Sequence, residues 1–192
     1  MKWNQSYQTY INQYKDLAIE QMLRYRIPAS ITLAQGLFES RAGQSDLVRQ
    51  GNNHFGIKCH NWTGPTQYHD DDARGECFRV YQDAKESYED HSRFLARQPR
   101  YSRLFSLNTT DYKGWAYGLK SCGYATNPQY ANKLIQIIEL YRLQDYDKAK
   151  LAFEKATVQG STSAYEWLAK IYDGGFGVQK NLPHAVLLRA KA

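Results

Sequence analysis

The sequence predicts a mainly helical α+β protein, with a helical body, one small β-hairpin lobe and a helical segment at the C-terminal end. Three observations support this fold class. Apolar residues recur at three- and four-residue steps along most of the chain, which is typical of amphipathic helices. Residues 59–81 instead contain turn signals and alternating side chains. Beyond Asp145 the composition shifts towards Ala and Lys, and residue pairs recur 36 residues apart.

Chain length, net charge and the distribution of apolar residues limit which classes of protein are possible. A chain of 192 residues is long enough for one domain with a real core plus a smaller piece. A net charge of +6 favours an anionic partner, but no run of Lys and Arg is dense enough to single out nucleic acid. No stretch is long and apolar enough to span a membrane, and the N-terminus lacks the apolar core of a signal peptide. Either the protein is cytoplasmic, or its leader is absent from this sequence.

Two helices open the chain. Residues 4–25 form an amphipathic pattern, and a second helix begins near Pro28, where a first-turn proline is tolerated. Apolar residues fall nearly all round this second helix, so we expect it to be buried, with Gly43 as its C-terminal stop. These apolar residues are Ile31, Leu33, Ala34, Leu37 and Phe38.

Glu39 lies in the last turn of this buried helix. Partial desolvation and the negative end of the helix dipole both raise the pKa of a carboxyl group there. A raised pKa is what a general acid needs near neutral pH. Gly36 leaves room for a ligand one turn back, and Gln35 is a candidate to hydrogen-bond that ligand. The alternative is a glutamate that turns to solvent at a helix end and pairs with Arg41.

A β-hairpin with an acidic tip follows. After a glycine-bracketed turn region at residues 50–58, we expect strands at 66–69 and 76–81 joined by the acidic loop 70–75. Cys59 lies at the entry to this unit and Cys77 on its return strand, so they either form a disulfide bond or remain two half-buried thiols. The third cysteine, Cys122, is left over, and the cysteines and histidines lack the paired spacing of a metal site.

The rest of the chain is predicted to be helical. Ser87 to Asp90 resembles a capping box that opens a helix ending near Arg97, and residues 100–105 form a short helical turn. Thr110 is expected to cap a helix that ends near Gly123, and Asn127-Pro128 to begin one that ends near Arg142. We therefore divide the chain into a domain at residues 1–144 and an incomplete helical repeat segment at 145–192.

Four motifs occur in a fixed order, and together they resemble the bacterial peptidoglycan N-acetylglucosaminidases, including the glucosaminidase domains of flagellar hydrolases and autolysins. The resemblance covers about Tyr10 to Leu143. Its motifs are Ala34-Gln-Gly-Leu-Phe-Glu-Ser-Arg-Ala-Gly43, Asn52-Asn-His-Phe-Gly-Ile-Lys58, Phe78-Arg-Val-Tyr81 and Gly123-Tyr-Ala-Thr-Asn-Pro-Gln-Tyr-Ala131. The C-terminal segment resembles the Sel-like subgroup of tetratricopeptide-type repeats, which implies an interaction platform for a protein partner.

The resemblance implies a lysozyme-like fold with the glycan bound between the helical body and the β-lobe. It places the catalytic acid on Glu39 and a site tyrosine on Tyr124. Where the family has a Thr-x-Glu pattern this sequence has His69-Asp-Asp-Asp72, so Asp71 is the preferred second acid and Asp70, Asp72 and Glu76 are alternatives. A solvated acidic turn is the other interpretation. No cofactor and no metal are implied.

Several side chains are candidates to bind the glycan. Asn53 and Phe55 are expected to shape the floor of the groove, unless they only build a turn. Aromatic side chains grip sugar rings, although any one of them can instead be part of the core. The aromatic candidates are Trp62, Tyr68, Trp115 and Tyr117. The histidines His60, His69 and His91 have no partner pattern and are expected to be surface or capping residues.

The implied reaction is hydrolysis of the β-1,4 bond after N-acetylglucosamine in peptidoglycan, by an exported enzyme. Glu39 would donate its proton to the departing sugar oxygen, and either Asp71 activates a water or the acetamido group of the substrate attacks. Two rival functions remain at this level. One is a non-catalytic glycan-binding scaffold, which would clear no peptidoglycan. The other is a lytic transglycosylase, which would leave anhydromuramic ends.

Overall fold

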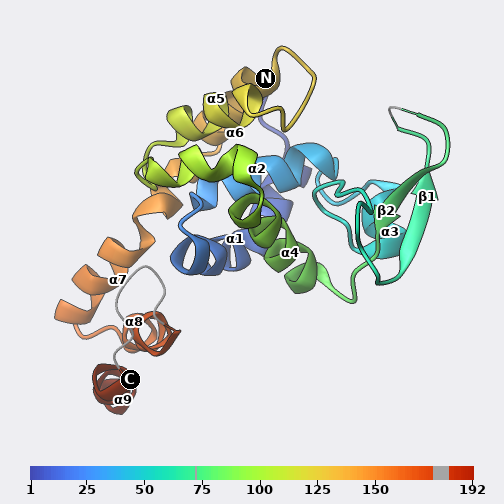
Figure 1. Cartoon of the computed structure of the whole chain (residues 1–192). Coiled ribbons are helices and arrows are strands. Elements are labelled where there is room, and N and C mark those ends of the chain that lie inside the picture. Colours follow the sequence, from blue (N-terminus) through green and yellow to red (C-terminus); the bar gives the residue numbers. More distant parts are fainter. Residues whose placement is uncertain (72, 175–181) are drawn as a thin grey trace.

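A computed structural model describes residues 1–71, 73–174 and 182–192, and it has the mainly helical architecture that the sequence predicts. A body of helices occupies the middle of the molecule, the β-lobe lies at one side, and three C-terminal helices extend from another side (Figure 1). The body contains α1 (Gln5–Tyr25), α2 (Ala29–Glu39), α4 (Ala84–Arg97), the 3-10 helix η1 (Pro99–Ser106), α5 (Tyr112–Ser121) and α6 (Tyr130–Leu140).

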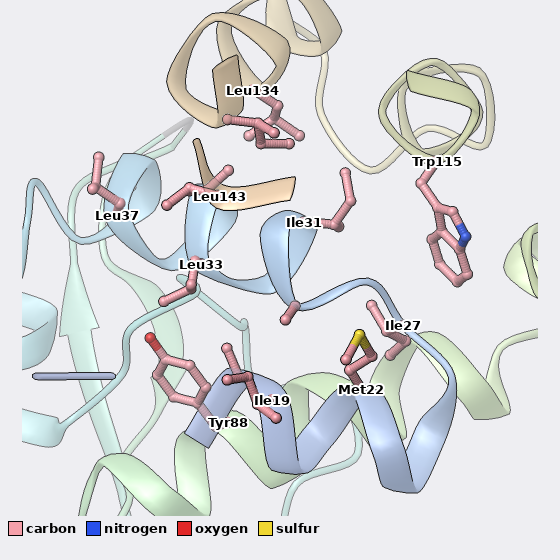
Figure 2. Close-up of a cluster of buried hydrophobic side chains, with 14 of the residues drawn as sticks. Ile19, Met22, Ile27, Ile31, Leu33, Leu37, Tyr88, Trp115, Leu134 and Leu143 are labelled. Atoms are coloured by element: carbon pink, nitrogen blue, oxygen red, sulfur yellow. The ribbon is translucent and has the colours of Figure 1, made fainter. Parts of the chain in front are cut away.

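Helix α2 passes through the core of this body. Helices α1, α5 and α6 pack on it, and Figure 2 shows apolar side chains from these helices and from α4 around it. Ile31, Leu33 and Leu37 are fully buried although they point in different directions, as the apolar pattern predicts. Truncating one of them to alanine would cost about 2–5 kcal/mol, so the position of α2 is firmly fixed.

Both ends of α2 depend on residues outside it. Pro28 precedes the helix and provides no side-chain cap. The carboxylate of Asp147 instead accepts hydrogen bonds from the backbone N–H of Ser30 at 2.8 Å and from its hydroxyl at 2.6 Å. At the other end the helix stops at Glu39, four residues before the predicted Gly43. A left-handed turn follows, with φ of 50° at Arg41, 57° at Ala42 and 78° at Gly43.

The β-lobe consists of α3 (Asp46–Gly51) and an antiparallel hairpin of β1 (Thr66–His69) and β2 (Glu76–Arg79). Tyr68 pairs with Cys77, and the predicted hairpin is confirmed, although β2 ends two residues earlier than expected. A disulfide bond joins Cys59 to Cys77, which decides between the two alternatives that the sequence left open. It fixes the segment before the hairpin to the returning strand.

Three helix starts differ from the sequence prediction. Asp83, not Ser87, caps α4 by accepting a hydrogen bond from the backbone of Glu86. The Ser87 hydroxyl is buried and accepts from the backbone N–H of His54. Helix α5 is capped by Asp111 rather than Thr110, and α6 begins at Tyr130 after Gln129. In the first two cases an aspartate close by in the sequence competes successfully for the N-cap position.

The C-terminal part contains the 3-10 helix η2 (Leu143–Lys148), α7 (Ala149–Val158), α8 (Thr162–Gly174) and α9 (Leu182–Lys191). Phe153 of α7 stacks on Trp167 of α8 with ring centroids 5.3 Å apart. Helix η2 crosses the predicted boundary between residues 144 and 145 and packs on α2. The two-domain division and the Sel-like repeat remain predictions. None of the helices among the described residues combines the length and the apolar character that crossing a bilayer requires.

Candidate active site

A cleft of about 430 Å³ lies where the helical body meets the β-lobe. The end of α2, the loop that follows α3, the hairpin tip, η1 and the loop between α5 and α6 all contribute side chains to it. These elements come from positions far apart in the sequence, and the disulfide bond and core helices bring them together. Glu39, Asp71 and Tyr124, the three predicted catalytic residues, all line this cleft.

Glu39 stands at the last position of α2 and is half-buried in the cleft wall. Burial raises the pKa of Glu39 to about 7, and the negative charge of Asp71 acts in the same direction. A hydrogen bond from Tyr130 acts the opposite way and lowers it. The carboxyl group is therefore half protonated near neutral pH, so it can serve as a general acid there.

A buried chain of hydrogen bonds leads to Glu39 from the protein interior. Nε2 of His91 lies 3.0 Å from the side-chain oxygen of Gln35, and the amide nitrogen of Gln35 donates to the Tyr130 hydroxyl at 2.9 Å. Because that hydroxyl accepts from Gln35, its single proton is left for the nearby carboxyl group of Glu39, whose pKa the hydroxyl lowers. Burial lowers the pKa of His91 to about 3, so the imidazole is neutral and donates through Nε2.

The hairpin tip carries the predicted second acid. Asp71 faces the cleft, whereas Asp70 is used locally and accepts a hydrogen bond from the backbone of Gly75 at 2.7 Å. Glu76 pairs with Lys58 at 2.7 Å on the β-lobe. Asp72, the remaining alternative, lies outside the described residues. Of the acidic candidates in the described part of the hairpin, Asp71 is the one that lines the cleft with Glu39.

Tyr124 lies beside this pair. Its ring stacks on Tyr130 with centroids 5.7 Å apart. Burial, and next the charge of Glu39, hold the pKa of Tyr124 well above its usual range, so its hydroxyl stays protonated and can donate a hydrogen bond to a ligand. Tyr124 and Tyr130 thus place two phenolic hydroxyl groups near one carboxyl group.

Three predicted binding residues are corrected by their burial. Gln35 and Trp115 are 0% exposed, so neither reaches a ligand directly. Gln35 acts inside the hydrogen-bond chain, and Trp115 packs edge-on against Phe105 in the core. Asn53 is 1% exposed, and its side chain is used entirely by the backbones of Ile57 and Arg79. It builds the turn, which was the alternative interpretation.

The other predicted binding residues divide into two groups. Phe55 lines the cleft and stacks on His91 with centroids 3.9 Å apart, which fits a place in its floor. Trp62, Tyr68 and Tyr117 are not among the described residues that line the cleft. Trp62 packs on Tyr81, whereas Tyr68 and Tyr117 are exposed at 70% and 56%. Their role in binding sugars stays a prediction.

The structure also adds residues that sequence analysis did not select. Tyr130 was not selected as a site residue, yet its hydroxyl is the hydrogen-bonding group that lowers the pKa of Glu39. His91 was expected at the surface or in a cap, but it is fully buried at the far end of the hydrogen-bond chain. The motif from Gly123 to Ala131 contains both Tyr124 and Tyr130, so the sequence carried a signal that could have identified Tyr130. Other residues that line the cleft include Lys58, His60, Arg100, Tyr101, Thr126 and Asn127.

A helical body, a small β-lobe and a carboxyl group of raised pKa in the cleft between them define a lysozyme-like class of protein. Residues 15–143 match the sequence profile of the Glucosaminidase family, which is described as mannosyl-glycoprotein endo-beta-N-acetylglucosaminidase. The chain belongs to this family. Among its described residues, no group of three or more His, Cys, Asp or Glu side chains could hold a metal ion.

Similar proteins agree with this assignment. The chain is 33% identical over 149 residues to the exo-glucosaminidase LytG of Bacillus subtilis, covering 72% of this chain and 52% of LytG. It is 34% identical over 126 residues to the peptidoglycan hydrolase FlgJ of Salmonella typhimurium, covering 59% and 39%. The chain thus spans about half or less of these curated relatives.

Solved structures are similar over most of the chain. The catalytic domain of the autolysin Auto from Listeria monocytogenes superposes with a TM-score of 0.63 at 30% identity, covering 76% of this chain and 90% of that one. The glycoside hydrolase domain of FlgJ from Salmonella typhimurium gives a TM-score of 0.60 at 26% identity, covering 81% and 99%. The similarity therefore covers about three quarters or more of this chain and nearly all of each solved domain.

Proposed function

We propose that this protein is a peptidoglycan hydrolase that cleaves the β-1,4 bond after N-acetylglucosamine, with Glu39 as the general acid. The observation that carries this proposal is a carboxyl group with a pKa of about 7 in a cleft that also contains a second acid. Membership of the Glucosaminidase family and the printed activities of the relatives support the choice of a glycan substrate.

In the proposed reaction, protonated Glu39 donates to the oxygen that leaves with the departing sugar. Tyr130 then stabilises the carboxylate that remains, because its hydroxyl proton is not used by Gln35 and is available to Glu39. Tyr124 donates a hydrogen bond to the acetamido group or to the sugar ring. Asp71 also lines the cleft, where it activates a water or orients the acetamido group for attack.

The products separate these routes. Attack by a water that Asp71 activates inverts the anomeric configuration, whereas attack by the acetamido group retains it. Proton NMR of the first product formed distinguishes the two anomers. The same products show whether cleavage is internal or from one chain end. Both modes occur among similar proteins, because the family is described as endo-acting and LytG is named an exo-glucosaminidase.

The decisive experiment measures clearing of purified peptidoglycan by the natural protein and by Glu39→Gln between pH 5 and 8. Hydrolysis by the natural protein and a loss of at least a thousandfold in the variant are expected. No clearing at any pH would contradict the proposal and favour the scaffold alternative. Mass spectrometry of the products should find reducing N-acetylglucosamine ends, because anhydromuramic ends would indicate a lytic transglycosylase.

The substrate lies outside the cytoplasmic membrane, so the proposed function requires an exported protein. The Cys59–Cys77 disulfide bond is consistent with an oxidising compartment. A protein partner for α7 to α9 is part of the proposal only through the resemblance of this segment to helical repeats.

A further inference from the structure

A second hollow of about 430 Å³ adjoins the catalytic cleft. It lies between the start of α1 and the turn that follows α2, and Ser6, Tyr7, Arg41 and Gln44 are among the residues that line it. Phe38 lines both this hollow and the catalytic cleft. The two spaces are therefore neighbours that share the Phe38 side chain, and a polymer bound in the cleft that extended past Phe38 would reach the second hollow.

The charges around this hollow favour an anion. Among the described residues that line it, none is acidic and one, Arg41, is cationic. The side chain of Arg41 is exposed, and within the described part of the chain its guanidinium has no hydrogen-bond or ion-pair partner. Nζ of Lys133 lies 5.4 Å from the centre of the Phe38 ring, which adds a second positive charge at the boundary with the cleft.

The backbone at Arg41 makes an arginine at this position notable. Its φ of 50° lies in the left-handed region, which glycine and asparagine adopt more readily than other residues. The guanidinium forms no contact among the described residues that would compensate for this conformation. The turn itself holds the backbone in this conformation, since the N–H of Arg41 donates to Phe38 and its carbonyl accepts from Gln44, and the exposed guanidinium is left to contact a ligand.

We propose that this hollow binds a free carboxylate of the peptide carried by a muramic acid residue next to the cleaved bond, with Arg41 as its ligand. The inference rests on the proposed function for the identity of the polymer. Peptidoglycan fits because its glycan alternates neutral sugars with sugars that bear a peptide rich in free carboxylates. A guanidinium binds a carboxylate by two parallel hydrogen bonds, which gives both affinity and orientation.

The test is a binding measurement in the Glu39→Gln background, so that the polymer is not consumed. Arg41→Asn removes the guanidinium while keeping a residue that tolerates the left-handed conformation. Arg26→Asn is the matched control, because Arg26 is also an exposed arginine with a left-handed φ of 62° and lies at the opposite end of α1. Both variants lower the net charge equally.

Two ligands are compared by calorimetry. One is soluble peptidoglycan fragments, and the other is the same fragments after carbodiimide coupling to methylamine has converted their free carboxylates to neutral amides. Arg41→Asn is expected to weaken binding of the native fragments roughly tenfold and to leave binding of the neutral fragments unchanged. Arg26→Asn should leave both unchanged.

Two outcomes would overturn the inference. One is equal binding of native fragments by the Arg41 variant and its parent. The other is an equal loss on native and neutral fragments, which would mean that Arg41 contacts something other than a carboxylate. Thermal unfolding of Arg41→Asn at or above the parental Tm excludes a folding defect. Clearing assays with Glu39 intact test the proposed hydrolysis separately, so failure of one idea does not imply failure of the other.

Discussion

The amide nitrogen of Gln35 lies 2.9 Å from the hydroxyl oxygen of Tyr130, and this contact determines which way the tyrosine proton points. Gln35 donates, so the proton of Tyr130 is left for the nearby Glu39, whose pKa the hydroxyl lowers. A fully buried residue thereby affects the proposed general acid. The positioning of Gln35 itself depends on His91, which is buried on the far side.

Tyr130→Phe removes the hydrogen bond that lowers the pKa of Glu39, so we expect that pKa to rise. The alkaline limb of the pH–rate profile should move to higher pH, and kcat should fall roughly 10- to 100-fold, as expected for losing a hydrogen bond to a charged group. Gln35→Met should move the limb in the same direction by a smaller amount. A lower rate with an unmoved limb would mean that Tyr130 is only structural.

Asp71→Asn should move the alkaline limb of the pH–rate profile to lower pH. The negative charge of Asp71 raises the pKa of Glu39, so its removal lowers that pKa and the activity disappears at a lower pH. Asp70→Asn is the control, because Asp70 sits on the same loop and bonds the backbone of Gly75. The assignment of Asp71 would be wrong if Asp70→Asn changed the profile as much.

Glu39→Gln should inactivate the enzyme and stabilise the fold at alkaline pH. The folded-state pKa of Glu39 is about 7, above its ordinary 4.5, so the native state binds more protons between these values. Its contribution to stability is therefore present below pH 4.5 and is lost as the pH rises through about 7. We expect Glu39→Gln to raise the free energy of unfolding by about 1–3 kcal/mol at pH 8. Urea unfolding at pH 8 and pH 5 measures this, and an equal gain at both values would contradict the account.

Asp147→Ala should destabilise the protein by about 1–3 kcal/mol, because it leaves the buried N–H of Ser30 without a partner. Burial raises the pKa of Asp147 to about 7, so Asp147→Asn should keep the fold and flatten the fall in stability above pH 4.

A chain that ends at residue 144 should melt at a lower temperature than one that ends at 148. Equal melting temperatures for these two chains would mean that η2 contributes nothing to α2.

Reduction of the Cys59–Cys77 disulfide bond should loosen the lobe that carries Asp71. The bond spans 18 residues, and a crosslink of that length contributes about 3 kcal/mol by restricting the unfolded chain. We expect a lower Tm and slower clearing of peptidoglycan for the protein with both cysteines changed to serine. Cys122→Ser is the control, since Cys122 is a free thiol. A double variant that matched the natural protein in both measurements would contradict the prediction.

The sequence by itself determined most of the helices, the hairpin and the place of Glu39 at the end of a buried helix, because these depend on local patterns. Apolar residues all round the helix before Glu39 identified it as buried, and burial is the main cause of the raised pKa. Alternation between two turn signals located the hairpin. The starts of α4 and α5 were missed because several residues in each stretch can cap a helix.

Only the tertiary structure decided which side chains meet. The cap of α2 comes from Asp147, 117 residues from its partner Ser30, and no local pattern predicts that contact. Gln35 looked like a ligand-binding residue and Tyr130 was not selected, but packing joins them beside Glu39. The physical reason is that periodicity specifies which face of an element is buried, whereas hydrogen-bond partners depend on how whole elements pack.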